Sequence, residues 1–154
     1  MRKADIGNAL DSLGDDVRAH MRNLASQFRA FSKEACAPAV MKAAVDTPKR
    51  AQAQVQGWMA AYDAKNGAGS AQTFLVSCLS AAGTGKTLAQ VNSDLAALIA
   101  QAQTLVAHVQ NDGWTWAQVA DAIDAQFVPT ASPDFVFSQL PVPSNYVTVW
   151  GEAW

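Results

Sequence analysis

The sequence predicts an all-α protein, with a helical bundle of four to six helices over residues 1–127 and an extended, Pro-rich C-terminal arm over residues 128–154. Apolar residues recur at steps of three and four through most of the first segment, which is typical of amphipathic helices. Four of the six prolines lie in the second segment. Proline lacks the amide hydrogen that a helix needs, so this segment is not expected to be helical.

A long helix is predicted at the start of the chain. Its apolar stripe consists of Ile6, Leu10, Leu13, Val17, Met21, Leu24, Phe28, Phe31 and Ala35. Gly7 and Gly14 weaken the pattern, so a short first helix could separate from the rest.

The opposite face of this helix carries mixed charges. Its basic residues are Arg18, Arg22, Arg29 and Lys33, and its acidic residues are Asp15, Asp16 and Glu34. The mixture predicts a solvated face with ion pairs between residues four apart. A contact of the four basic side chains with phosphate or DNA is the alternative.

Proline and glycine signals divide the next segment. Pro38 suits the first turn of a short helix. Thr47-Pro48 predicts that a second helix starts there, because threonine is a good cap and proline a good first residue. Asn66-Gly67 is expected to end that helix, since both residues tolerate left-handed backbone angles. Its predicted buried stripe is Ala51, Val55, Trp58, Met59 and Tyr62.

Further helices are predicted up to the arm. Residues from Ser70 fit a helix, although residues 73–76 alone would also fit a strand. The clearest apolar stripe runs from Leu88 to Val109 and is followed by a glycine stop signal. The last helix begins with a capping box and a hydrophobic staple. The capping box is Thr115 with Gln118, the staple is Trp114 with Val119, and the core face is Trp116, Val119, Ala120, Ile123 and Phe127.

Composition and charge narrow the class of protein. A length of 154 residues predicts one domain, and a hydrophobic fraction of 50% excludes disorder over most of the chain. A net charge of −2 argues against a purely electrostatic nucleic-acid clamp. Residues 1–66 carry a net charge of +3 and residues 67–154 a net charge of −5, with only 7 charged side chains in the later part. Such a charge-poor surface is expected to be covered in an oligomer or a larger assembly, and a neutral exposed surface is the alternative.

No catalytic constellation, metal site, cofactor site or small-molecule substrate site is predicted, so the chain is not expected to be an enzyme. His20 and His108 are isolated, and Cys36 and Cys78 are expected to be reduced thiols in the core. No apolar run is long enough to cross a membrane, and the first residues lead into no apolar segment of a secretory signal.

One glycine-rich loop resembles a phosphate-binding motif. Residues 80–87 end in Gly83-Thr84-Gly85-Lys86-Thr87 and resemble the Walker A loop of P-loop NTPases, in which the lysine reaches phosphate and the hydroxyl holds Mg²⁺. Ser80 stands where the motif has its first glycine, and no strand suited to a Walker B follows. We therefore expect a glycine turn between helices, with Thr84 or Thr87 capping the second. A P-loop-like nucleotide-binding protein is the alternative.

The arm is the predicted partner-binding region. Its candidate contact residues are Phe135, Phe137, Leu140, Val142, Tyr146, Val147, Val149, Trp150 and Trp154. The run from Tyr146 to Trp150 fits a strand with apolar side chains on both faces. Ordering so long a segment costs more conformational entropy than loose packing on its own domain returns, so the arm is expected to dock on an adjacent subunit.

A helical body followed by a proline-punctuated C-terminal segment resembles the small head-to-tail adaptor, or connector, proteins of tailed bacteriophages. The resemblance covers the whole chain and is architectural. It implies a non-enzymatic virion protein assembled in the host cytoplasm, which forms a homo-oligomer, contacts adjacent different subunits and places its basic first helix near DNA. A decoration or tail-completion protein, or a monomeric helical binding protein with a self-docked arm, are the alternatives.

Overall fold

The computed structural model describes residues 2–31 and 33–130, so the predicted contact residues of the arm, from Phe135 to Trp154, lie outside the described part. The described part is all-α, as predicted. Its helices are α1 (Lys3–Phe28), the short 3₁₀ helix η1 (Arg29–Phe31), α2 (Pro38–Asn66), α3 (Ser70–Ala82), α4 (Leu88–Asp112) and α5 (Trp116–Gln126). Residues 73–76 lie within α3 and are therefore helical.

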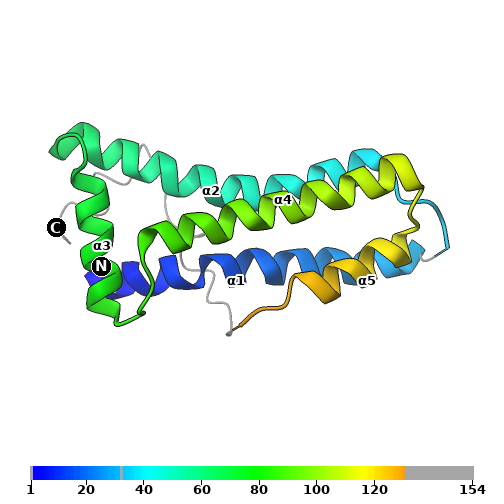
Figure 1. The fold of residues 1–154 in the computed structure, drawn as a ribbon, viewed down its shortest axis with the longest axis horizontal. Coiled ribbons are helices and arrows are strands. Elements are labelled where there is room, and N and C mark those ends of the chain that lie inside the picture. The colour runs from blue at the N-terminus through cyan, green and yellow to red at the C-terminus, as the bar shows by residue number, and fades with distance from the viewer. Residues whose placement is uncertain (1, 32, 131–154) are drawn as a thin grey trace.

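The helices form an elongated bundle (Figure 1). α1, α2, α4 and α5 run along its long axis, while α3 crosses one end. α1 packs mainly on α3 and α5, and α2 packs mainly on α4. The other end is joined by two backbone hydrogen bonds between the α1–α2 and α4–α5 connections, from Cys36 N to the Trp114 carbonyl (2.9 Å) and from Trp116 N to the Glu34 carbonyl (3.0 Å).

One hydrophobic core runs through the bundle. The predicted stripes of α4 and α5 are buried, and Thr87 with Gln90 and Thr115 with Gln118 form capping boxes. The core residues of α1 are Ile6, Ala9, Leu10, Leu13, Val17, Met21, Ala25 and Phe28. The predicted stripe of this helix is too long, because Phe31 is 53% exposed and Ala35 is also exposed. α1 ends at Phe28, and the tighter turn of η1 changes the phase of the pattern.

The predicted restart at Thr47-Pro48 is wrong, because α2 is continuous and contains Pro48 in its interior. A proline inside a helix removes one backbone hydrogen bond and costs about 3 kcal/mol. Here the apolar stripe continues in phase across the proline, and Pro48 is itself buried. Packing of α2 on α4 therefore accounts for the unbroken helix.

Gly7 and Gly14 do not break α1, so no short first helix separates from the rest. A Cβ atom at Gly7 would lie 2.1 Å from the carbonyl oxygen of Cys78 in α3. One at Gly14 would lie 2.1 Å from a carboxylate oxygen of Asp94 in α4. The backbone of α3 therefore approaches α1 closely at Gly7, and the Asp94 side chain of α4 approaches it closely at Gly14.

We expect Gly7→Ala to destabilise the protein by about 1–3 kcal/mol, the usual cost of forcing atoms into a packed core. In an open helix the same change would stabilise it by about 0.5–1 kcal/mol, so the sign of the effect reports the contact with α3. Denaturant unfolding followed by circular dichroism measures this. The matched control is Asn8→Ala on the exposed side of the same turn, and a stable Gly7→Ala protein would contradict the close approach.

Candidate functional site at the root of the C-terminal segment

The best-defined polar site among the described residues holds the start of the C-terminal segment. Asp15, in the middle of α1, is only 5% exposed. It accepts hydrogen bonds from the backbone N–H of Thr130 (2.9 Å) and from the Thr130 hydroxyl (3.0 Å). We call this pair the root of the segment. It fixes the last described residue, which is itself exposed, to the middle of α1.

An arginine joins the root to α4. Arg18 lies one turn after Asp15 and donates from Nη1 to the Asp15 carboxylate at 3.3 Å. Its other terminal nitrogen, Nη2, donates to Asp94 at 2.5 Å. Gly14 leaves the space in which this pair meets, because a side chain there would overlap both partners. Three separate parts of the chain thus share one charge network.

The remaining arginines of the predicted basic face are also paired. Arg29 donates to Asp121 at 2.8 Å and to Asp124, both on α5. These two hydrogen bonds, with Asp124 contributing more, raise the pKa of Arg29 above its usual value. Arg22 lies 3.9 Å from the same Asp124. Lys33 is exposed. Arg18, Arg22 and Arg29 are therefore neutralised by carboxylates of α1, α4 and α5, which leaves less positive charge for phosphate than the sequence pattern indicated.

The sequence analysis placed Asp15 and Asp16 on a solvated face, and this is wrong. Asp15 is 5% exposed and Asp16 is 1% exposed. A carboxylate is rarely buried unless it has partners, and one of the two partners of Asp15, Thr130, is 115 residues away in the sequence. Helical periodicity reports only neighbours along one helix, so it carried no signal for this contact.

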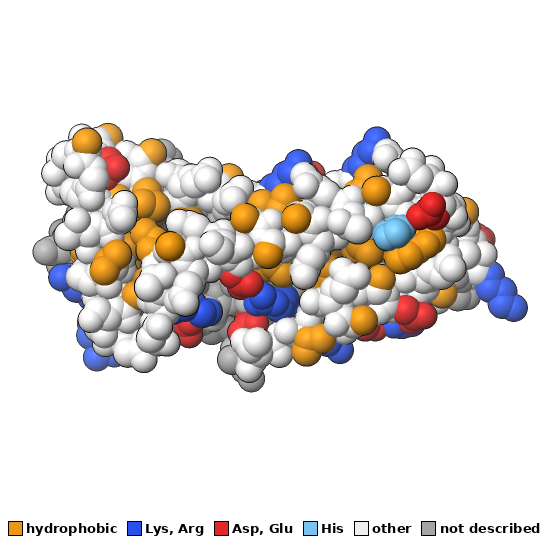
Figure 2. Space-filling view, viewed as in Figure 1, with side chains coloured by type: hydrophobic (Ala, Val, Ile, Leu, Met, Phe, Trp, Pro, Cys, Tyr) orange, Lys and Arg blue, Asp and Glu red, His pale blue; other side chains and the backbone are white. Residues whose placement is uncertain are grey.

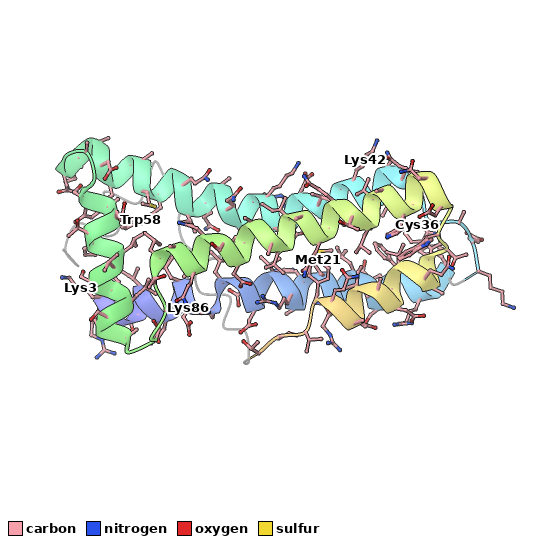
Figure 3. All side chains as sticks on the ribbon, viewed as in Figure 1. Lys3, Met21, Cys36, Lys42, Trp58 and Lys86 are labelled. Atoms are coloured by element: carbon pink, nitrogen blue, oxygen red, sulfur yellow. The ribbon has the colours of Figure 1, made fainter. Side chains whose placement is uncertain are left out.

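The glycine-rich loop joins two helices and is preceded by α3, where a P-loop would have a strand. Gly83 and Gly85 adopt positive φ angles. Of the two expected caps, Thr84 and Thr87, it is Thr87 that caps α4. Lys86 extends from the start of α4 toward α1 (Figure 3) and lies 3.0 Å from the Asp11 carboxylate. It also donates to the Asp11 carbonyl at 3.2 Å. Its ammonium group is thus engaged within the fold.

Histidine and cysteine residues form no further site in the described part of the chain. His108 stacks on Trp114, with ring centroids 4.1 Å apart, and its Nδ1 lies 2.7 Å from Asp112. No group of three metal-ligating side chains occurs among residues 2–31 and 33–130. Cys36 and Cys78 are free and buried, as predicted, and burial raises the pKa of Cys78 to about 11.

Two further observations bear on function. Among the described helices, none combines the length and the apolar character needed to cross a membrane. Comparisons with protein-family models, characterised proteins and solved structures find no match to this chain.

We expect Asp15→Ala to lower the free energy of unfolding by about 1–3 kcal/mol, because Thr130 loses its acceptor and Arg18 loses one of two carboxylates. The variant should also speed hydrogen exchange of the Thr130 amide, measured by NMR. The control is Asp112→Ala, which removes an exposed carboxylate and should cost no more than about 1 kcal/mol. Unchanged exchange at Thr130 would show that Asp15 does not hold the root.

For the glycine-rich loop, we expect titration with Mg–ATP to give no saturable binding, because Lys86 is held by Asp11. Isothermal calorimetry measures this directly. Saturable binding to the full chain that is lost in Lys86→Ala would instead establish the nucleotide-binding alternative. Gln90→Ala, at the neighbouring capping box, controls for disturbance of the loop.

Proposed function

We propose that the chain is a non-enzymatic structural subunit of a larger assembly and that its C-terminal segment docks on a neighbouring subunit. The supporting observation is the contrast between body and segment. The core of the described body extends from Ile6 to Phe127, and Phe127 is fully buried. The sequence after Thr130 adds nine candidate apolar contact residues, including Trp150 and Trp154, and two acidic side chains.

The surface of the body fits the same proposal. α3 carries no charged side chain, and the charged residues of α4 are Asp94 and Asp112, with His108 beside the latter. Figure 2 shows a face on which few charged side chains lie over α3 and α4. A surface of this kind tolerates burial against another subunit, because few charges must be removed from water.

The finer proposal is a virion component of the head-to-tail adaptor type, with a decoration or tail-completion protein as the nearest alternatives. It rests on the architecture of a helical body followed by a Pro-rich segment. In this proposal the chain forms a homo-oligomer and also contacts adjacent different subunits. Proximity of α1 to DNA is the weakest part of it, given the paired arginines. A monomeric binding protein remains the alternative outside this class.

We expect light scattering of the full chain to report oligomers, and Trp150→Ser with Trp154→Ser in the full chain to shift the mass toward the monomer. Large aromatic side chains dominate the energetics of interfaces, so this pair should carry much of the association. The matched control is Trp114→Ser on the body. Circular dichroism should report unchanged helix content in the double variant. A monomeric full chain at all concentrations would support the monomeric alternative.

A further inference from the structure

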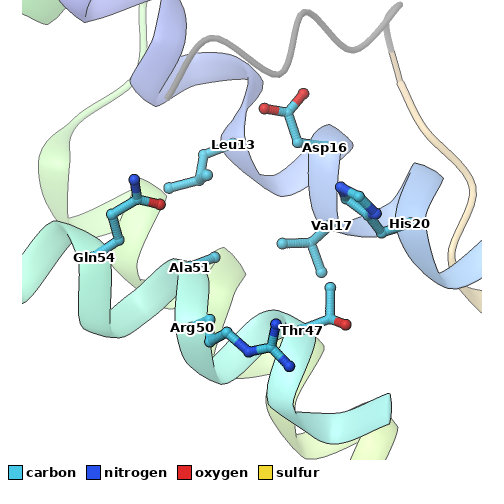
Figure 4. Close-up of a pocket in the computed structure, with 8 residues that line it drawn as sticks. All are labelled: Leu13, Asp16, Val17, His20, Thr47, Arg50, Ala51 and Gln54. Atoms are coloured by element: carbon cyan, nitrogen blue, oxygen red, sulfur yellow. The ribbon is translucent and has the colours of Figure 1, made fainter. Parts of the chain in front are cut away.

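A groove lies between α1 and α2, apart from the root (Figure 4). It is lined by Leu13, Asp16, Val17, His20, Thr47, Arg50, Ala51 and Gln54, and its volume is about 260 Å³. Side chains from α1 face side chains from α2 across it. We call it the α1–α2 groove.

We propose that the α1–α2 groove receives residues 134–137 of the same chain, Asp134-Phe135-Val136-Phe137, and so fixes the first part of the C-terminal segment on its own body. This goes beyond the proposed function: it assigns Phe135 and Phe137 to the chain's own body and leaves the contact residues from Leu140 to Trp154 for the neighbouring subunit.

The length of chain between Thr130 and Asp134 supports this occupant. Thr130 is bound to Asp15, and the next residue of α1, Asp16, lines the groove. Four residues of chain span at most about 14 Å, and packed helices lie about 8–10 Å apart, so Asp134 can reach the α2 side of the groove. The root also holds these residues at a high local concentration, which favours the groove of the same subunit over that of another copy.

Charge supports it as well. Arg50 is an exposed cation on the rim of the groove, and it forms no ion pair with any other residue of the described ranges. Asp134 is the first acidic residue after Thr130. The competing hollow that Thr130 lines contains Arg18 and Lys86, but these are already paired with Asp94 and Asp11. Arg50 is therefore the better partner for Asp134.

The size and lining of the groove suit a short peptide. Its volume lies below the about 300–1,000 Å³ that is usual for small-molecule pockets, so it fits one or two side chains. Leu13, Val17 and Ala51 provide an apolar floor for a phenylalanine ring. Thr47 carries a hydroxyl group that suits hydrogen bonding to a peptide backbone.

Exchange of the two charges tests the proposal. In the full chain, Arg50→Glu and Asp134→Lys should each raise the rate of limited chymotrypsin cleavage at Phe135 and Phe137 by about two- to five-fold, the range expected for an exposed ion pair. The double variant should return the rate to near the original. Lys49→Glu and Glu152→Lys are the matched controls and should leave it unchanged. Equal effects of Arg50→Glu and Lys49→Glu, or no recovery in the double variant, would overturn the proposal.

Two further measurements complete the test. Circular dichroism shows whether Arg50→Glu remains folded, and Arg50→Gln replaces it if it does not. The cleavage assay is then repeated at dilutions where light scattering reports only monomer. Docking within one subunit predicts that the rate difference between the original chain and Arg50→Glu persists there. Loss of that difference on dilution would show that the groove takes the segment of another copy and would overturn the same-subunit assignment.

Discussion

Burial of the apolar face of α1 is the constraint on which the rest of the structure depends. This helix contacts all four of the other α-helices in the described part, whereas α2 and α4 pack mainly on each other. α3 crosses α1 at Gly7, and Asp94 of α4 approaches it at Gly14. The positions of α3, α4 and α5 are therefore set relative to one helix, and so is the root, because Asp15 belongs to that helix.

Ion pairs give this packing its register. Arg18 of α1 pairs with Asp94, Arg29 pairs with Asp121 and Asp124, and Lys86 pairs with Asp11. Each of these pairs joins the basic first part of the chain to the acidic later part or the reverse. Exposed pairs contribute little to stability, typically about 0–1 kcal/mol each. Their value lies in specificity, because sliding α5 along α1 would leave several charges without partners.

Local physical rules predicted much of this fold from the sequence. The helix that starts at Thr115 was predicted to its capping residues, because an N-cap and its partner lie three residues apart and share one turn. The restart predicted at Pro48 is wrong because a proline suits a helix start and, when its ring is buried, a helix interior as well. Its outcome depends on α4, which contacts α2 from far along the chain.

The candidate site was less predictable for the same reason. Arg18, Arg22 and Arg29 were recognised as one face, but apart from Asp15 their carboxylate partners lie on other helices, and periodicity does not identify partners across a bundle. Asp15 was assigned to solvent because a charged residue is usually exposed. Nothing near it in the sequence indicates that Thr130 returns to cover it. The need for glycine rather than a larger residue at Gly7 and Gly14 likewise arises only when α3 and α4 are in place.

The position at which Thr130 is held bears on the proposed assembly. Phe127 is fully buried, Val128 is 50% exposed, and Thr130 is bound to a carboxylate in the middle of the bundle. The last described residue, Thr130, is therefore held at a fixed point on the helix that contacts all the other α-helices, and not at the end of α5, where a last turn would fray. A fixed origin reduces the volume that the following residues explore, and so reduces the entropy lost when they bind. If the segment joins subunits, load on it passes through Asp15 to α1 and from there to every other helix.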